Sequence, residues 1–398
     1  MYKLYARMYQ SVFKSVSKLL PWRYPTLIEG ENSVLDLVHH IKEENLERVL
    51  IVTDNVLESL GLLNGLKTSF EENKVTYIVY NKTVPNPTID NIEEAFLMYK
   101  QFACEAIIAF GGGSPIDCAK GVAAKVARPK KSIKRMKGVL KILKKTPLLF
   151  AVPTTAGTGS EATIAAVISN SVTHEKYAIN DTVLIPSYAV LDPLLTIGLP
   201  KHITSTTGMD ALTHAVEAYI GRSNTTETIK LSETAVSIIY KNIEESYKNG
   251  NNVDARNNML KASYYAGVSF TRAYVGYVHA IAHTLGGFYQ TPHGLANAVI
   301  LPIVLKYYGS SVYKPLAKLA EVAGLAVSGN EAKDALMFID SIKELNKRMD
   351  IPSKLEGIKE EDIDTMVDRA YKESNPLYPV PRILTKKDLK NLYYLIKE

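Results

Sequence analysis

The stretch Ala106-Ile-Ile-Ala-Phe-Gly-Gly-Gly-Ser-Pro-Ile-Asp-Cys-Ala-Lys120 predicts the fold of the first half of the chain. Glu105–Phe110 is short and apolar, which is typical of a buried strand. Three glycines follow, and then Ser114 as N-cap and Pro115 as first helical residue predict the start of a helix. Glycines let a backbone approach a ligand, and a helix N-terminus favours phosphate. The stretch therefore predicts a phosphate-binding turn between a strand and a helix, with a simple tight turn as the alternative.

Short apolar segments and helical patterns alternate on both sides of this stretch. Further strands are expected at Arg48–Thr53, Val75–Tyr80, Pro147–Val152 and Tyr188–Asp192, with helices near Val56–Phe70, Ile89–Phe102 and Pro115–Val126. Such alternation is typical of an α/β domain with a mostly parallel, Rossmann-like sheet.

A second loop of the same kind, Pro153–Glu161, follows the next predicted strand. Two loops at adjacent strand ends form the crevice in which open α/β sheets bind ligands, and Thr155 and Thr158 offer hydroxyls to phosphate or to a nicotinamide amide. The order of motifs differs from the usual dinucleotide fingerprint, because the candidate ribose-binding acid, Asp54, precedes the glycines. These motifs predict a nucleotide in the crevice without specifying which one.

From about Thr204 onward the pattern becomes helical. Helices are expected at Asp210–Tyr219, Thr226–Asn249, Asp254–Val268, Leu295–Tyr307, Tyr313–Ala323, Ala332–Asp350 and Lys386–Ile396. The expected organisation is an N-terminal extension over residues 1–20, an α/β dinucleotide-binding domain over 21–199 and an all-helical metal-binding domain over 200–398.

Three of the eight histidines, His279, His283 and His293, fall within fifteen positions. His279 and His283 are four apart in an apolar run, so in a helix both imidazoles project from one face. Thr291-Pro292 predicts a new helix, with Thr291 as N-cap and Pro292 at the first position, which places His293 at its N-terminus.

Asp210 and His214 repeat the four-residue spacing on another predicted helix. Alone, this pair could equally be a hydrogen bond that orients a helix. Combined with His279 and His293, it supplies one oxygen and three nitrogens, a set that suits Fe²⁺ or Zn²⁺ better than Mg²⁺ or Ca²⁺.

Composition limits the classes of function. The chain has 398 residues, 46% apolar and 22% charged, as is ordinary for a soluble globular protein. Its net charge of +6 comes from dispersed basic residues, which gives nucleic-acid binding little support. The only two cysteines form no disulfide framework and indicate a reducing cytoplasm. No apolar run approaches the ~20 residues that span a bilayer.

Residues 1–20 form an amphipathic pattern with Lys and Arg on the polar side. The apolar stripe comprises Leu4, Met8, Val12, Val16 and Leu19. We expect this helix to dock onto its own domain or onto a partner subunit. A helix lying on a membrane surface is the alternative.

Over nearly its whole length, from about Tyr24 onward, the chain resembles the iron-containing (group III) alcohol dehydrogenases, which share the dehydroquinate synthase-like architecture. The matching stretches are Val52–Asp54, Pro85–Thr88, Gly111–Asp117, Pro153–Glu161, Gly208–Tyr219 and Val278–Pro302. Several motifs in order and at the right spacing make this resemblance specific.

Carried over position by position, the resemblance implies roles for individual residues. Asp210, His214, His279 and His293 would bind the metal, and His283 would lie near it as a catalytic proton relay rather than a ligand. Residues at cofactor-contacting positions are Asp54, Asn86, Gly112, Gly113, Ser114, Asp117, Thr154, Thr155, Thr158, Thr163, Lys176 and Thr196. Val167 and Phe270 correspond to the substrate channel, whereas Ala165, Arg272 and Tyr274 depart from some relatives and leave the substrate open.

The resemblance implies an NAD(H)-linked alcohol dehydrogenase or aldehyde reductase with Fe²⁺, or alternatively Zn²⁺, acting on a short- to medium-chain primary alcohol or aldehyde, in a cytoplasmic homodimer. Asp54 predicts a preference for NAD(H) over NADP(H), because its carboxylate would repel a 2′-phosphate. Three alternatives share the architecture: a sugar-phosphate cyclase that uses NAD and metal, a metal-independent maleylacetate reductase, and a non-enzymatic filament or scaffold protein. A cyclase needs basic residues around the metal for its phosphorylated substrate, and Arg272 is the only candidate.

Overall fold

The computed structural model describes residues 2–171 and 176–398. They form two compact units, which we call the sheet unit, Pro21–Gly198, and the helical unit, Leu199–Glu398 together with Met1–Leu20. The division after residue 198 lies one residue from the expected boundary. Residues 1–20, which we expected as a separate extension, group with the helical unit.

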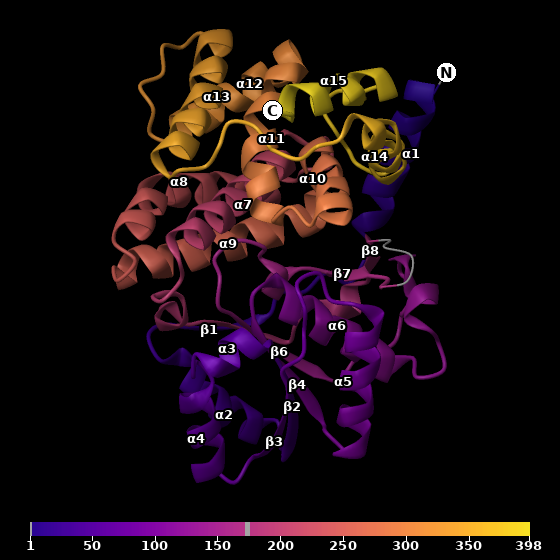
Figure 1. Ribbon diagram of the computed structural model, residues 1–398, viewed down its shortest axis with the longest axis vertical. Coiled ribbons are helices and arrows are strands. Elements are labelled where there is room, and N and C mark those ends of the chain that lie inside the picture. Colours follow the sequence, from indigo (N-terminus) through magenta and orange to yellow (C-terminus); the bar gives the residue numbers. More distant parts are fainter. Residues whose placement is uncertain (1, 172–175) are drawn as a thin grey trace. The chain divides into compact units, whose positions relative to one another are not determined.

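The sheet unit is built on a six-stranded sheet in the order β1-β9-β6-β4-β2-β3, in which every neighbouring pair is parallel (Figure 1). The strands are β1 Thr26–Glu29, β2 Arg48–Val52, β3 Thr76–Tyr80, β4 Ala106–Gly111, β6 Leu148–Pro153 and β9 Tyr188–Leu191. The prediction of a parallel α/β fold is therefore confirmed.

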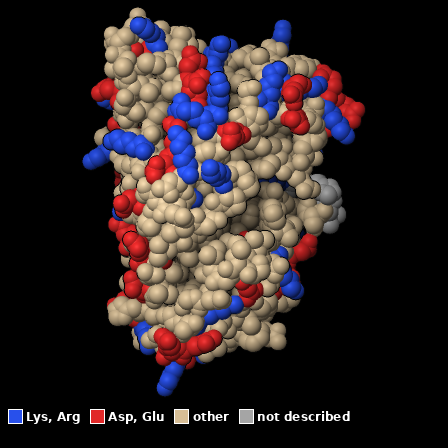
Figure 2. Space-filling model, turned by 60° about the vertical axis from the view of Figure 1, so that its left-hand side comes forward, with Lys and Arg blue, Asp and Glu red and all other residues tan. Residues whose placement is uncertain are grey.

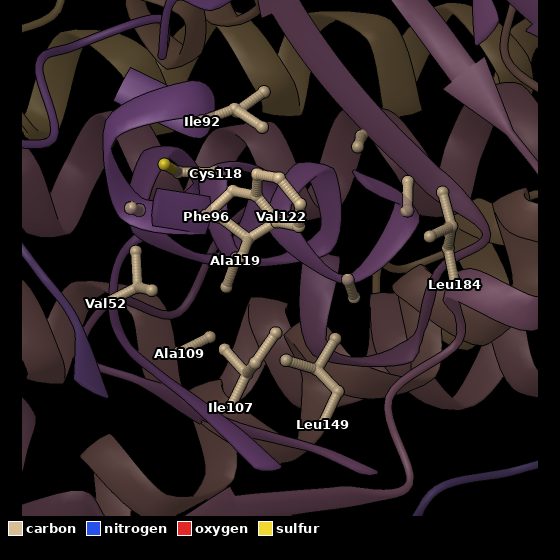
Figure 3. Close-up of a cluster of buried hydrophobic side chains, with 14 of the residues drawn as sticks. Val52, Ile92, Phe96, Ile107, Ala109, Cys118, Ala119, Val122, Leu149 and Leu184 are labelled. Atoms are coloured by element: carbon tan, nitrogen blue, oxygen red, sulfur yellow. The ribbon is translucent and has the colours of Figure 1, made fainter. Parts of the chain in front are cut away.

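Helices cover both faces of this sheet, because alternate residues of each strand point to opposite sides. They are α2 Ser33–Glu43, α3 Asn55–Ser59, α4 Asn64–Glu72, α5 Ile89–Gln101 and α6 Gly113–Ala127. On one face Ile107 of β4 packs with Ile92 of α5 and Val122 of α6 (Figure 3). On the other face Ile108 belongs to a cluster that includes Phe70 of α4. Continuous apolar strands thus have a core on each side.

Some elements of the sheet unit differ from expectation. The single helix expected over 56–70 is two helices, α3 and α4, and Gly61 lies between them with φ +72°. The helix α2 and strand β1 were not predicted. A small second sheet, β5 Gly138–Val139, β7 Ala165–Ser169 and β8 Lys176–Asn180, was missed as well. Its strands are short, and β7 and β8 alternate between buried and half-buried residues without a matching alternation of apolar and polar types.

The helical unit contains no strand of either sheet among its described residues. Its helices are α1 Tyr2–Ser17, α7 Lys201–Ile220, α8 Thr226–Lys248, α9 Val253–Ala273, α10 Tyr277–Tyr289, α11 His293–Tyr308, α12 Tyr313–Val322, α13 Glu331–Arg348, α14 Glu360–Ser374 and α15 Lys386–Ile396. The prediction of a helical second half is confirmed, although α14 was not predicted.

Two predicted helix starts are wrong. Helix α6 begins at Gly113 with Gly112 as N-cap, so Ser114 and Pro115 lie inside its first turn. The chain turns earlier than expected because Gly111 has φ +149°, a conformation that favours glycine. Helix α11 begins at His293 with Pro292 in the N-cap position, and no side chain caps it.

Helix α1 docks onto the helical unit, but through the opposite face from the one expected. The predicted stripe is exposed: Leu4 is 68%, Met8 61% and Val12 63% accessible. The buried residues of α1 are Ala6 and Gln10. The polar face docks because it contacts a loop whose backbone carbonyls need donors, and alanine allows the close approach.

In the described part of the chain, one helical stretch, His293–Val322, has the length and composition to cross a membrane, yet 61% of its most apolar window is buried inside the fold. Core helices of soluble proteins pass the same test.

The surface charge is mixed. Lys and Arg lie interspersed with Asp and Glu on the face in Figure 2.

Candidate metal centre and nucleotide loops

Three helices bring the four predicted ligands together. Asp210 and His214 lie one turn apart on α7, His279 lies on α10, and His293 is the first residue of α11. One donor atom from each lies within 4.8 Å of every other, and all but the half-buried His293 are buried. The spacing predicted each pair, and the packing of α11 against both α7 and α10 joins them.

Glu217, which sequence reasoning missed, orients His279. Its carboxylate accepts hydrogen bonds from the backbone N–H groups of Gly276 (2.8 Å) and Val278 (2.9 Å), and so caps α10. It also lies 2.7 Å from Nδ1 of His279. Since a proton on Nδ1 leaves the lone pair on Nε2, Glu217 directs Nε2 toward the cluster as a ligand. The signal was available, because residues 210, 214 and 217 share one face of a helix.

Close helix approach explains two glycines of the centre. A Cβ on Gly276 would lie 2.6 Å from Oε1 of Glu217, which would displace the carboxylate. A Cβ on Gly294 would lie 2.4 Å from the carbonyl oxygen of Thr206, where α11 meets the backbone of α7. The first turn of α11, which carries His293, therefore reaches α7 only because residue 294 has no side chain.

The contacts of Asn297 show that three of the donor atoms converge. Its amide Nδ2 lies 2.6 Å from Oδ1 of Asp210, 3.2 Å from Nε2 of His279 and 3.1 Å from Nε2 of His293. A single nitrogen within hydrogen-bonding distance of three atoms shows that their lone pairs point to one region. Convergent lone pairs from a buried carboxylate and imidazoles fit a divalent transition metal such as Fe²⁺ or Zn²⁺.

His283 lies beside this cluster, one turn after His279 on α10. Its ring stacks on that of His293 with centroids 5.2 Å apart. Its Nδ1 lies 2.6 Å from Oε1 of Glu373 on α14, another residue that sequence reasoning missed. Burial raises the pKa of the Glu373 carboxyl, but His283, the hydroxyl of Tyr378 and His279 together outweigh it, and the net effect lowers the pKa.

The two glycine-containing loops of the sheet unit lie against each other. Gly111 pairs with Pro153 at the carboxyl ends of β4 and β6, and the N–H of Thr154 donates to the carbonyl of Gly111 over 3.1 Å. A Cβ on Gly113 would lie 2.7 Å from Cγ2 of Thr158, and a Cβ on Gly112 would lie 3.3 Å from Oγ1 of Thr155. Glycine is thus required for the loops to pack closely, at the sheet edge where open α/β folds bind ligands.

The buried ammonium of Lys120 holds the end of the second loop in place. Nζ of Lys120, a side chain with no exposed surface, donates to Oγ of Ser160 (3.1 Å), to the carbonyl and hydroxyl oxygens of Thr163 (2.9 Å each), and to the carbonyl of Ala165 (2.9 Å). Burial lowers the pKa of Lys120 to about 8, although the charges of Asp117 and Glu161 oppose the shift. Sequence reasoning did not single out Lys120.

Asp117 and Thr163, expected to contact the cofactor, are bound within the protein. Asp117 accepts from Oγ of Ser160 over 2.8 Å and from the N–H of Val167 over 3.1 Å. Burial raises the pKa of the Asp117 carboxyl. The side chain of Thr163 lies beside Lys120. Both residues therefore support the loop from inside.

Three other expected cofactor contacts form a group. The N–H of Asn86 donates to Oγ of Ser114 over 3.2 Å, and Nζ of Lys176 donates to Oδ1 of Asn86 over 2.7 Å. Asn86 has φ +56°. Ser114 belongs to the first turn of α6, so this group lies beside the glycine turn.

Asp54 follows β2, the neighbour of β4 in the sheet. Its Oδ1 accepts from the N–H of Leu57 over 3.0 Å and caps α3. Thr154 is buried, and the buried hydroxyl of Thr196 donates to the carbonyl of Pro193 over 2.8 Å.

The expected substrate residues lie in different units. Val167 belongs to β7, as does Ala165. Phe270 on α9 stacks on the ring of His214 with centroids 4.1 Å apart. Arg272 pairs with Glu227 over 2.6 Å, and Tyr274 packs edge-on against Phe13 of α1. Because its guanidinium is paired with the Glu227 carboxylate, Arg272 is poorly suited to bind the phosphate of a cyclase substrate.

Comparison with known proteins agrees with this geometry. Residues 25–193 match the model for iron-containing alcohol dehydrogenase, and residues 204–396 match the C-terminal model of the Fe-containing alcohol dehydrogenase family. The chain belongs to the iron-containing alcohol dehydrogenase family. It is therefore an oxidoreductase, as the resemblance implied, and these matches do not support the alternatives of a cyclase or a scaffold.

Individual relatives cover most of the chain. Alcohol dehydrogenase 4 of Schizosaccharomyces pombe is 37% identical over 356 residues, which are 88% of this chain and 83% of the relative. The NAD-dependent methanol dehydrogenase of Bacillus methanolicus is 34% identical over 92% of this chain and 96% of its own. The crystal structure of a 1,3-propanediol oxidoreductase superposes with a TM-score of 0.90 at 33% identity, covering 94% of this chain and 99% of that one.

Proposed function

We propose that this family member interconverts a short- to medium-chain primary alcohol and its aldehyde, with NAD(H) as hydride carrier and Fe²⁺ at the Asp/His cluster. The observation that carries the proposal is the convergence of Asp210, His214, His279 and His293 within 4.8 Å. The NAD dependence of the methanol dehydrogenase relative supports the choice of carrier. Because methanol and 1,3-propanediol both occur among the relatives' names, the substrate is proposed only as a class.

The helical unit supplies the metal ligands for the proposed reaction, and the sheet unit supplies the nucleotide loops. When bound, Fe²⁺ supplies Lewis-acid polarisation of the alcohol oxygen, and NAD⁺ supplies the hydride acceptor. Asp210 and the three imidazoles hold the ion, with Glu217 orienting His279. His283 exchanges the alcohol proton, a role that suits an imidazole near neutral pH. The glycine turn before α6 offers backbone N–H groups and a helix N-terminus to the pyrophosphate of the dinucleotide.

The test is aldehyde reduction by the full chain, purified without oxygen and loaded with Fe²⁺ or Zn²⁺. NADH oxidation followed across aldehydes of increasing chain length should show turnover that requires the metal, with a maximum at short to medium length. A protein that binds one ion per chain but oxidises NADH with none of these aldehydes would contradict the proposed substrate class.

Replacing Asp54 by Gly should shift the cofactor preference toward NADP(H). The side chain follows β2 at the loop edge of the sheet, and Oδ2 remains available because the α3 cap uses Oδ1. A carboxylate ~4 Å from a 2′-phosphate would repel it by a few kcal/mol at an effective dielectric of ~20. The nearby cations are engaged, since Lys67 pairs with Glu58 and Lys82 pairs with Glu94.

The measurement is the KM for NADPH relative to NADH in the parent and in Asp54→Gly. Equal efficiency of both cofactors in the parent would contradict the NAD preference and leave Asp54 as a helix cap alone. The matched variant Asp54→Asn separates the two roles of the side chain. It keeps an oxygen for the α3 cap but removes the charge that would repel a 2′-phosphate.

A homodimer in a cytoplasmic location stays a prediction. The two cysteines, Cys104 and Cys118, are free and buried, as suits a reducing compartment. Sedimentation of the full chain would measure the subunit number.

A further inference from the structure

A hydrogen-bonded chain within the helical unit begins at His283. Nδ1 of His283 lies 2.6 Å from Oε1 of Glu373, and the hydroxyl of Tyr378 donates to the same oxygen over 2.7 Å. Tyr378 is buried, whereas His283 and Glu373 keep part of their side chains accessible. Oε1 of Glu373 thus contacts the tyrosine hydroxyl and the imidazole at once.

Helix α1 holds the segment that carries Tyr378. Nε2 of Gln10, a residue only 6% exposed, donates to the carbonyls of Pro376 (3.0 Å) and Tyr378 (2.8 Å). The guanidinium of Arg7 donates to the carbonyls of Val380 (2.7 Å) and Pro381 (2.8 Å).

Arg7 also fixes the amide of Gln10, by donating to its Oε1 over 2.8 Å. Since Oε1 is occupied as an acceptor, Nε2 is the atom that faces the loop. The two side chains together therefore bind four backbone carbonyls between residues 376 and 381. This binding explains why α1 docks through its polar face.

We propose that Glu373 is a positioning residue for the proton relay, and that helix α1 keeps it in place by binding the loop of residues 376–381. This inference rests on the proposed function of His283. A carboxylate beside Nδ1 keeps the proton on that nitrogen, which leaves the Nε2 lone pair to take the proton of an alcohol. The imidazolium so formed keeps its Nδ1–H bond to Glu373, and in aldehyde reduction the proton returns from Nε2 to oxygen.

The positions of the neighbouring rings agree with this role. His283 stacks on His293 with an interplanar angle of 15°, and its ring is edge-on to His279 with centroids 6.1 Å apart. Rotation of the imidazole about its own axis would exchange Nδ1 for carbon at Glu373 and break the 2.6 Å contact. Glu373 therefore selects one orientation of a ring that lies against two ligands.

Glu373→Ala should lower kcat by about 10- to 100-fold, as loss of an orienting carboxylate typically does, with little change in the KM for aldehyde or in bound metal. Glu373→Gln should recover part of kcat, because its amide oxygen still accepts from Nδ1. Tyr378→Phe, which removes one hydroxyl, should give a smaller fall and keeps the test available if the alanine variant folds poorly.

A second readout does not depend on turnover. Nitrogen-15 NMR of the zinc-loaded chain should show His283, identified as the signal lost in His283→Asn, with its proton on Nδ1. In Glu373→Ala the signal should shift toward the tautomer protonated on Nε2. If the parent turned over no aldehyde, the proposed function would fail while this readout still tested the positioning by Glu373. An unchanged tautomer together with the parent kcat would overturn the role of Glu373.

The contribution of α1 is tested by Gln10→Ala against Ser15→Ala on the same helix. Ser15 is exposed, and its hydroxyl donates to the carbonyl of Ser11 of its own helix over 3.1 Å. We expect Gln10→Ala to lower kcat several-fold without loss of metal, in the direction of Glu373→Ala. If Gln10→Ala and Ser15→Ala had the same kcat as the parent, α1 would have no role in positioning the relay.

Discussion

Asp210→Ala and His279→Ala are each expected to lose turnover and bound metal together. Both residues are 2% exposed, and their donor atoms lie within 4.8 Å of each other. Removal of one of four ligands weakens affinity and disturbs geometry, so the loss of affinity should exceed the 10- to 100-fold that is typical when a supporting residue is removed. Metal content per chain and the rate of NADH-linked aldehyde reduction, measured on the same samples, check this result.

The control for these variants is His202→Ala. His202 lies at the start of α7, the helix of Asp210, but it is exposed and outside the cluster. It should keep both metal and rate. An Asp210→Ala protein with one ion per chain and the parent rate would show that the ion binds elsewhere.

Lys120→Met should destabilise the sheet unit and weaken cofactor binding. The variant keeps the length of the side chain but removes an ammonium that contacts four oxygens, and it leaves the carbonyls of Thr163 and Ala165 without this donor. It also leaves Asp117 buried without its cationic neighbour. Removing one partner from a buried set of hydrogen-bonded charged groups typically lowers the free energy of unfolding by about 3–5 kcal/mol. Because the loop above Lys120 includes Thr155 and Thr158, we also expect a higher KM for NADH.

Urea unfolding followed by circular dichroism measures the stability, and steady-state kinetics measures the KM. Lys125→Met is the control on α6. Lys125 is 9% exposed, pairs with the part-exposed Glu93 over 2.9 Å and donates to one carbonyl, that of Lys131, over 3.3 Å, so its loss should destabilise the unit less than the loss of Lys120. If Lys120→Met unfolded at the same urea concentration as Lys125→Met, the ammonium would not hold the loop.

Short-range sequence patterns predicted those features that depend only on residues close together in the chain. The i,i+4 spacing of Asp210 and His214 places two ligands on one face of a helix wherever that helix lies, and the run of glycines before Ser114 indicates a tight turn, in which Gly111 has φ +149°. The apolar strand segments likewise predicted a parallel sheet, because strands buried on both faces have no polar side. The resemblance to a family then assigned roles that the spacing alone left open.

Contacts between distant segments explain what the sequence did not reveal. Glu373 meets His283 across 90 positions, and Lys120 meets Thr163 across 43, so no periodicity relates either pair. The docked face of α1 was mispredicted for the same reason.

The sequence by itself determined a parallel α/β unit, a helical unit and the residue types of a metal centre, because these follow from short-range periodicity and side-chain chemistry. Only the tertiary structure decided that Glu217 and Glu373 orient two of the histidines and that Gln10 faces a loop whose carbonyls accept its hydrogen bonds. An amphipathic helix can bury either face, and the choice depends on what the neighbouring backbone must satisfy.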